Sequence, residues 1–244
     1  MRTLRESRSL LAVAERRLID SILPLIPNRI SSDHLTYLGF AGAIVTGISL
    51  ALSHFAPYLL SVALIGLFIN WFGDSFDGSL ARYRNVERPR YGFLIDHSLD
   101  LVSTTFILIG LGLSPYLPFG SACFALIIYL LFCGFVYVKV AADGVHRLDF
   151  CSIGATEFRL FIACWVLVVD RFDLRDIVNS SLSNGGTVRN VHWLDVIVAA
   201  MSVVACLGLV RVIFHEAAKL SRVEPVPFDP ETVVEILKVE RRMA

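Results

Sequence analysis

Four aspartates at helical spacing lie in a short polar stretch between two apolar runs. The stretch, residues 71 to 102, reads WFGDSFDGSLARYRNVERPRYGFLIDHSLDLV and contains Asp74, Asp77, Asp96 and Asp100. The first two are three residues apart and the last two are four apart, so on helices each pair shares one face. Because consecutive helices joined by a short loop are usually antiparallel neighbours, the two pairs are predicted to meet at the same depth.

Four carboxylates in one partly dry pocket repel one another unless some are protonated or cations neutralise them. Hard divalent cations prefer oxygen ligands, so the cluster predicts Mg²⁺ or Mn²⁺. Two such ions would balance the four negative charges, and a pair of ions suits chemistry on a diphosphate. The alternative is that single aspartates cap helices or pair with local arginines. It accounts poorly for all four, because ionisable groups within membrane segments are usually functional.

Small residues accompany the aspartates on both predicted helices. Gly78 and Ala81 lie on the aspartate face one turn onward, and Gly92 precedes Asp96 by one turn. Glycine and alanine let a bulky ligand approach the helix backbone closely. Arg82 follows and could clamp a phosphate. The pattern predicts a nucleotide-diphosphate pocket that opens to the cytoplasm.

The composition is that of a membrane protein. The 244 residues are 55% hydrophobic with a mean hydropathy of +0.66, too apolar for an ordinary soluble domain. The net charge of zero gives no field that would favour nucleic acid. The five cysteines form no CxxC pair, so they indicate neither a zinc site nor a disulfide framework.

The predicted fold class is all-α: an integral membrane protein with six transmembrane helices and an N-terminal amphipathic surface helix. The second and third helices are predicted to continue beyond the bilayer face, because DSFDGSLARY contains no strong helix breaker, and Pro89 marks the turn between them. The predicted spans are Leu35 to Leu52, Pro57 to Gly73, Gly92 to Leu113, Pro118 to Val140, Thr156 to Val169, and Leu194 to Phe214.

The N-terminal segment, residues 2 to 27, has apolar residues at helical spacing with charges on the other faces. This pattern predicts an amphipathic helix on the membrane surface, the alternative being a soluble helix packed on the core. The predicted division is therefore a juxtamembrane helix over 1–33, a six-helix membrane domain over 34–220 and a C-terminal tail over 221–244.

Lysine and arginine gather in the N-terminal helix, in the loop after the second span and in the tail, whereas the loops at 53–56 and 114–118 have none. By the positive-inside rule, the protein is a multi-pass membrane protein whose termini and aspartates both face the cytoplasm.

The aspartate stretch resembles the signature of the CDP-alcohol phosphotransferase family, D-x-x-D-G-x-x-A-R…G-x-x-x-D-x-x-x-D. Here it reads D-S-F-D-G-S-L-A-R, nine residues, then G-F-L-I-D-H-S-L-D. The segment IPNRISSDHLTYLG is similar to the Pro-Asn…Leu-Thr sequence that leads into the family's first span. Every defining position is filled: Asp74, Asp77, Gly78, Ala81, Arg82, Gly92, Asp96 and Asp100.

The resemblance implies a reaction in which a CDP-alcohol and an acceptor alcohol, one of them a lipid, form a phosphodiester and release CMP in phospholipid biosynthesis. The donor would be of the CDP-diacylglycerol or the CDP-choline and CDP-ethanolamine type. Asp74, Asp77 and Asp96 would hold two Mg²⁺ or Mn²⁺ ions, and Asp100 would assist the second ion and act as general base. The family also implies a homodimer. Its nucleotide-binding residues here would be Asp74, Gly78, Ala81, Arg82 and Gly92.

Four other polar residues are candidates for acceptor binding or for support of the ligands. Glu157 and Arg159 lie in GATEFRL, which is similar to a Gly-Pro-Thr-Glu element of the choline and ethanolamine branch, with Ala155 replacing proline. The pair could also be interfacial. Asn70 precedes Asp74 by one turn and is either support or a buried hydrogen-bonding residue, and His97 either contacts the nucleotide or is structural.

Three other functions are weighed against this one. A membrane prenyltransferase carries its aspartate motifs on distant helices, and it leaves the small residues unexplained. A divalent-cation channel or transporter would use the aspartates as a selectivity ring, but neither broken helices nor paired halves are visible. A non-catalytic lipid-binding protein does not need all four aspartates.

Overall fold

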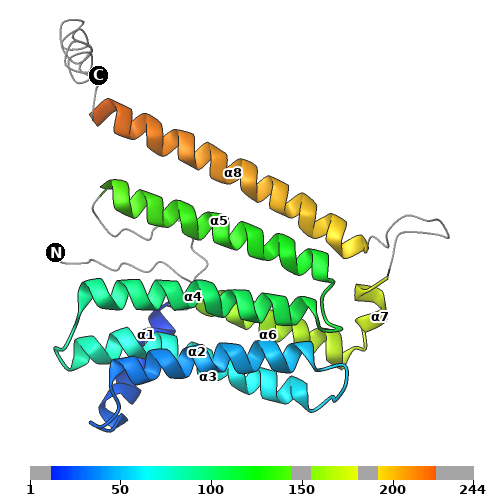
Figure 1. The fold of residues 1–244 in the computed structure, drawn as a ribbon, viewed down its shortest axis with the longest axis horizontal. Helices are drawn as coiled ribbons and strands as arrows, with labels where there is room; N and C mark the ends of the chain where they lie inside the picture. Colours follow the sequence, from blue (N-terminus) through cyan, green and yellow to red (C-terminus); the bar gives the residue numbers. More distant parts are fainter. Residues whose placement is uncertain (1–11, 144–154, 181–191, 224–244) are drawn as a thin grey trace, which may run out of the picture. The chain divides into compact units, whose positions relative to one another are not determined.

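The structure is a computed structural model that describes residues 12–143, 155–180 and 192–223, and within these ranges it is helical and has no strands. Backbone contacts divide the chain into a unit of residues 1–204, which holds the aspartate stretch, and a unit of residues 205–244. The elements in Figure 1 are α1 (Ala12–Ile22), η1 (Leu23–Leu25), α2 (Ser32–Ala51), α3 (Leu59–Tyr83), α4 (Pro89–Gly112), α5 (Phe119–Asp143), α6 (Ala155–Arg171), α7 (Arg175–Val178) and α8 (Trp193–Val223).

Among the described residues, five helices are long and apolar enough to cross a membrane: α2, α3, α4, α5 and α8. The chain is therefore a multi-pass, all-helical membrane protein. The fifth of the six predicted spans, at 156–169, is not confirmed as a membrane span. This range lies within helix α6, which has 17 residues. At about 1.5 Å per residue it is shorter than the roughly 30 Å hydrocarbon core, and its first turn carries Glu157 and Arg159.

The predicted continuation of the second and third spans is confirmed. Helix α3 runs through the polar stretch and ends in a left-handed turn at Asn85, where φ is 56°. The backbone N–H of Val86 donates to Ala81 O at 3.0 Å and that of Asn85 to Arg82 O at 3.1 Å, the Schellman pattern that ends many helices. Helix α4 then begins at Pro89, a residue suited to the first helical position.

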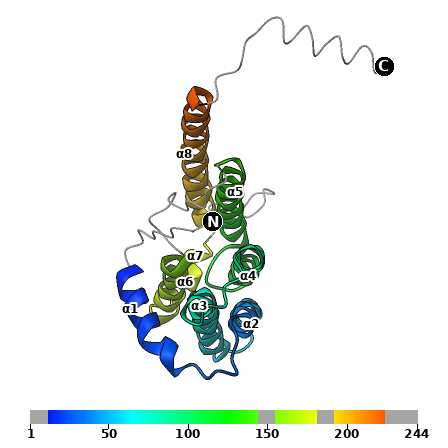
Figure 2. The same ribbon diagram turned by 90° about the vertical axis from the view of Figure 1, so that its left-hand side faces the viewer.

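Helix α2 lies against both α3 and α4 (Figure 2). These two consecutive helices do not pack closely along their lengths, yet their aspartates meet as predicted. Glycines permit the arrangement: a Cβ on Gly73 would overlap the backbone of Gly39, and one on Gly110 would overlap the backbone of Gly47. These close approaches let α2 pack tightly against both helices that carry the aspartates.

Two apolar clusters hold the helices together. The larger joins α2, α3, α4 and α6 through buried residues such as Leu67, Leu108 and Val166. The smaller joins α1 to α2 and α3, and it consists of Ile19, Leu23, Leu35, Phe76 and Leu80. The smaller cluster places α1 next to the segment of α3 that carries Asp74 and Asp77.

Arg84, at the C-terminal end of α3, binds the connection between η1 and α2. Its guanidinium donates to the carbonyl oxygens of Ile26 and Pro27 at 3.0 Å each, and also to that of Ile30. These bonds satisfy three carbonyls of an irregular segment. They hold the start of α2 against the aspartate end of α3.

Part of the predicted N-terminal helix is helical, as α1, with Ile19 buried and Val13 and Leu18 exposed. Its place on a membrane surface stays a prediction. The basic residues Arg5 and Arg8 of the pattern lie outside the described residues, as does the tail from residue 224.

Gly110→Ala should destabilise the protein by about 1–3 kcal/mol, because the added methyl forces α4 away from the α2 backbone. Thermal unfolding in detergent micelles measures the change. The matched control is Gly134→Ala on α5, where a Cβ would meet no described atom within 4 Å. The control should leave the melting temperature unchanged or raise it slightly. Equal melting temperatures for the two variants would show that the α2–α4 approach is not tight.

Candidate active site

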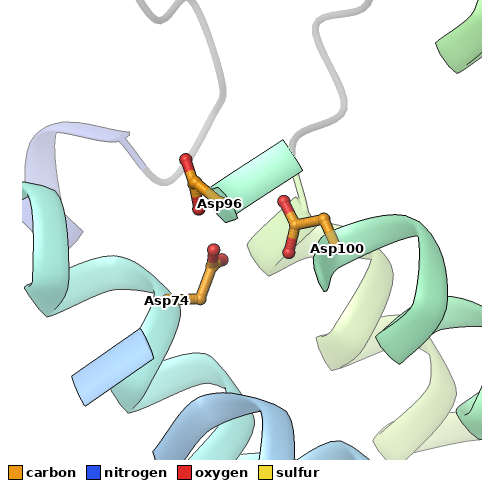
Figure 3. A group of neighbouring side chains, drawn as sticks. All are labelled: Asp74, Asp96 and Asp100. Atoms are coloured by element: carbon orange, nitrogen blue, oxygen red, sulfur yellow. The ribbon is translucent and has the colours of Figure 1, made fainter. Parts of the chain in front are cut away.

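Three of the four predicted aspartates converge in the structure. Asp74 extends from α3, and Asp96 and Asp100 extend from α4, so that their carboxylates point toward one another (Figure 3). Each offers one carboxylate oxygen, and these three oxygens lie within 4.8 Å of one another. All three residues are half-buried. The helical spacing in the sequence therefore correctly predicts their convergence.

Asp77 lines the same pocket but lies outside this group of three. It is 7% exposed, and its Oδ2 accepts a hydrogen bond from the Thr36 hydroxyl at 2.6 Å. Its Oδ1 accepts one from the backbone N–H of Gly78. Both oxygens thus already have donors, and the role of Asp77 as a metal ligand stays a prediction.

The pocket is formed by α2, α3 and α4 together. Helix α2 forms one wall because it packs against both aspartate helices. The lining residues are Thr36, Gly39, Phe40, Asn70, Asp74, Asp77, Asp96, Leu99, Asp100 and Ser103.

A buried arginine from α6 reaches this pocket. Arg159 is 8% exposed, and its Nη1 donates to Asp74 Oδ2 at 2.7 Å while its Nη2 lies 3.6 Å from Asp100 Oδ1. Its Nε donates to Asn70 Oδ1 at 2.7 Å, and Asn70 Nδ2 donates to Gly39 O at 3.0 Å. Arg159 and Asn70 therefore form one network with the aspartates, in which Arg159 pairs with Asp74.

The donor set fits a hard divalent cation. Asp74, Asp96 and Asp100 bring three carboxylates close together, and Arg159 supplies a single positive charge to them. Like charges in a partly desolvated site need compensation, and carboxylate oxygens are the ligands that Mg²⁺ and Mn²⁺ prefer. These three aspartates are the residues that could hold such an ion.

The residues predicted to bind the nucleotide lie beside the aspartates on the same two helices. Arg82 is exposed, and its Nη2 donates to Ser79 Oγ at 3.1 Å. Its guanidinium lies over Gly78, where a Cβ would come within 3.4 Å of Nη1. At Gly92 a Cβ would meet no described atom within 4 Å, and Ala81 is half-buried. Open space at Gly92 agrees with the predicted room for a ligand, while the nucleotide contacts of all these residues stay predictions.

Of the four acceptor candidates, Asn70 is the one found among the described residues that line the pocket. His97 is half-buried, with its ring centroid 4.3 Å from that of Phe93 and its Nδ1 3.4 Å from Asp96 Oδ2. Glu157 is half-buried in the first turn of α6. His97 therefore lies beside the aspartates, and Asn70 and Arg159 are the candidates that bond within their network.

No pattern in the sequence singled out Thr36, whose hydroxyl donates to Asp77. The only signal for it is the Leu-Thr pair of the segment before the first span, which carries no chemistry by itself. The Thr36 and Asp77 side chains are 41 residues apart in the chain. Only the packing of α2 on α3 brings them together.

Comparison with known protein families agrees with this geometry. A family model described as CDP-alcohol phosphatidyltransferase matches residues 29–219. The match spans most of the 244 residues and includes the whole aspartate pocket and Arg159. The chain therefore belongs to the CDP-alcohol phosphatidyltransferase family.

Proposed function

We propose that the protein transfers a substituted phosphate group from a CDP-alcohol to an acceptor alcohol and releases CMP, in a reaction that depends on a divalent cation. Membership of the family supports phosphotransfer between a CDP-alcohol and an alcohol in phospholipid synthesis. The observation that carries the proposal is the convergence of Asp74, Asp96 and Asp100 in a pocket shared by three membrane helices. The donor is of the CDP-diacylglycerol or the CDP-choline and CDP-ethanolamine type.

The proposed cofactor is Mg²⁺ or Mn²⁺, with two ions per site. Asp74, Asp96 and Asp100 would hold them, and Asp77 would join if its bonds to Thr36 and Gly78 rearrange. When bound, the ions neutralise the diphosphate and stabilise the negative charge that develops on the departing CMP.

Asp100 is the proposed general base. Its carboxylate accepts the proton of the acceptor hydroxyl as the hydroxyl oxygen forms a bond to the phosphorus that carries the donor alcohol. The bond from that phosphorus to the bridging oxygen breaks, and CMP leaves with the bridging oxygen. Arg159 Nη2, 3.6 Å from Asp100 Oδ1, orients the carboxylate for this role.

The four candidates for acceptor binding or support fall into two groups according to the residues that they contact. Asn70 and Arg159 bond to each other, and Arg159 also bonds to Asp74, which supports a role in positioning the aspartates. His97 and Glu157 remain the proposed acceptor residues. The proposed nucleotide site consists of Asp74, Gly78, Ala81, Arg82 and Gly92.

The proposed topology puts the pocket and both termini in the cytoplasm, as the arginine and lysine distribution predicts, and it requires α6 to cross the membrane with the five other helices. The proposed division of the chain is a juxtamembrane segment over 1–33, a membrane domain over 34–220 and a C-terminal tail over 221–244. A homodimer is the oligomeric state that the resemblance implies, and crosslinking in vesicles tests it.

In liposomes, the protein should release CMP from one donor and acceptor pair only when Mg²⁺ or Mn²⁺ is present. The donors are CDP-diacylglycerol, CDP-choline and CDP-ethanolamine. The acceptors are inositol, inositol phosphate, glycerol phosphate, serine, choline and diacylglycerol. Asp100→Asn should lower the rate by about 10²–10⁴-fold, the range expected for loss of a general base.

The matched control is Asp173→Asn, the same chemical change at an exposed loop residue that pairs with Arg175. It should leave the rate unchanged. Folded protein that binds metal but releases no CMP from any pair would contradict the proposal. Divalent-cation flux across the liposome without CMP release would favour a channel instead.

Arg159→Met should make Mn²⁺ bind about tenfold more tightly, because the guanidinium and the ion compete for the carboxylates of Asp74 and Asp100. Titration of free Mn²⁺ by electron paramagnetic resonance measures the affinity. CMP release should nevertheless fall by about tenfold or more, since the aspartates lose the side chain that orients them. Arg159→Lys keeps the positive charge and serves as the control. Unchanged Mn²⁺ affinity in Arg159→Met would mean that the arginine does not compete with the ion.

A further inference from the structure

One carboxylate oxygen of Glu15 connects three helices. Glu15 is a half-buried residue of α1, and its Oε1 accepts hydrogen bonds from Trp71 Nε1 at 2.9 Å, from Ser75 Oγ at 2.8 Å and from Thr156 Oγ1 at 2.8 Å. The first two donors lie on α3 and the third lies on α6. Hydrogen bonds to a charged acceptor are among the stronger ones in proteins. Glu15 therefore ties α1, α3 and α6 together at one point.

On α3, the donors to Glu15 alternate with residues of the pocket network. Trp71 follows Asn70, and Ser75 follows Asp74. Asn70 and Asp74 are the two side chains that accept hydrogen bonds from Arg159. The same two turns of α3 thus bond to Glu15 on one side and to Arg159 on the other.

On α6, Thr156 is one turn before Arg159, so both residues lie on the same face. The buried apolar residues of α6, Ile162, Val166 and Val169, pack into the larger core cluster farther along the helix. At its first turn, the described contacts include the bond to Glu15, the bonds of Arg159 and a stacked contact of Phe158 with a tyrosine of α5. Apart from the packing of Phe158 on the larger cluster, the described contacts that join this end of α6 to α1 and α3 are polar.

We propose that Glu15 is a positioning residue that holds the first turn of α6 against α3 and so sets how closely Arg159 approaches Asp74. This inference rests on the proposed metal site. The hydrogen bond to Thr156 keeps the guanidinium on the carboxylates, where it competes with a divalent cation. The N-terminal helix, through Glu15, thereby sets the affinity of the aspartate pocket for that cation.

A role limited to stability makes the opposite prediction. If Glu15 merely stabilised the packing of α1, its loss would loosen the pocket and weaken cation binding or leave it unchanged. If Glu15 positions Arg159, its loss releases the competing guanidinium, so the cation binds more tightly. The direction of the change in Mn²⁺ affinity separates the two roles.

The cleanest variant is Thr156→Val, which removes the α6 hydroxyl and keeps the charge of Glu15. In the full chain in lipid nanodiscs, electron paramagnetic resonance should show half-saturation at an Mn²⁺ concentration about three- to tenfold lower than in the wild type. The matched control is Thr105→Val on α4, whose hydroxyl donates to the carbonyl oxygen of Leu101 in its own helix at 2.8 Å. The control should leave the Mn²⁺ affinity unchanged.

Variants of Glu15 separate its charge from its hydrogen bonds. Glu15→Ala should shift Mn²⁺ binding in the same direction as Thr156→Val. Glu15→Gln removes the charge but keeps an oxygen acceptor, so its Mn²⁺ affinity should match the wild type. Asp20→Ala, at an exposed residue of the same helix, is the control for removal of a nearby negative charge and should have no effect.

A double-mutant cycle tests whether the effect passes through Arg159. In an Arg159→Met background, Thr156→Val should cause no further change in Mn²⁺ affinity. An unchanged or weaker affinity in Thr156→Val alone overturns the inference, as does an equal shift in both backgrounds. Absence of Mn²⁺ binding by the wild type overturns the metal site and the inference together. The expected shift without CMP release supports the inference and rejects the transferase reaction.

Discussion

Mutual repulsion of carboxylates inside an apolar helix bundle is the constraint on which the rest of this structure depends. Asp74, Asp96 and Asp100 bring oxygens within 4.8 Å of one another, and Asp77 is buried beside them. In a site of low polarity, charged groups at this distance are stable only when partners compensate them. Arg159 provides the compensation in the structure, and a divalent cation would provide more. The elements around the pocket are arranged so that these partners reach the aspartates.

Close packing of the α2 backbone lets hydrogen-bonding groups reach the aspartates and their partners. Because glycines face one another where α2 crosses α3, no side chain keeps the two backbones apart. The Gly39 carbonyl can then accept from Asn70, and Thr36 can donate to Asp77. Tight packing and the polar network are therefore two consequences of the same small residues. A bulkier α2 would widen the pocket and leave Asp77 without its hydroxyl donor.

Helix α6 contributes charge to a site that α2, α3 and α4 enclose. Its 17 residues are at the short end of the range that can span the bilayer. The first turn carries Thr156 and Arg159, and both of these side chains bond to residues of other helices. A helix with a buried arginine at its start requires such partners, because an unpaired charge in this setting is costly. The polar partners on α1 and α3 explain how a short, charged helix is tolerated beside the membrane helices.

Local patterns in the sequence determined the long apolar helices, the continuation of α3 through the polar stretch, the turn at Pro89 and the face that each aspartate pair shares. Such features repeat within one helical turn, so the chain encodes them over a few residues. Only the tertiary structure decided that α2 packs against both α3 and α4, and that α6 brings Arg159 to the aspartates. It also decided the partners of the carboxylates, which are 41 residues apart for Thr36 and Asp77, and 85 for Asp74 and Arg159. No spacing rule links residues so distant, because packing of whole helices, through glycines and apolar clusters, chooses which side chains meet.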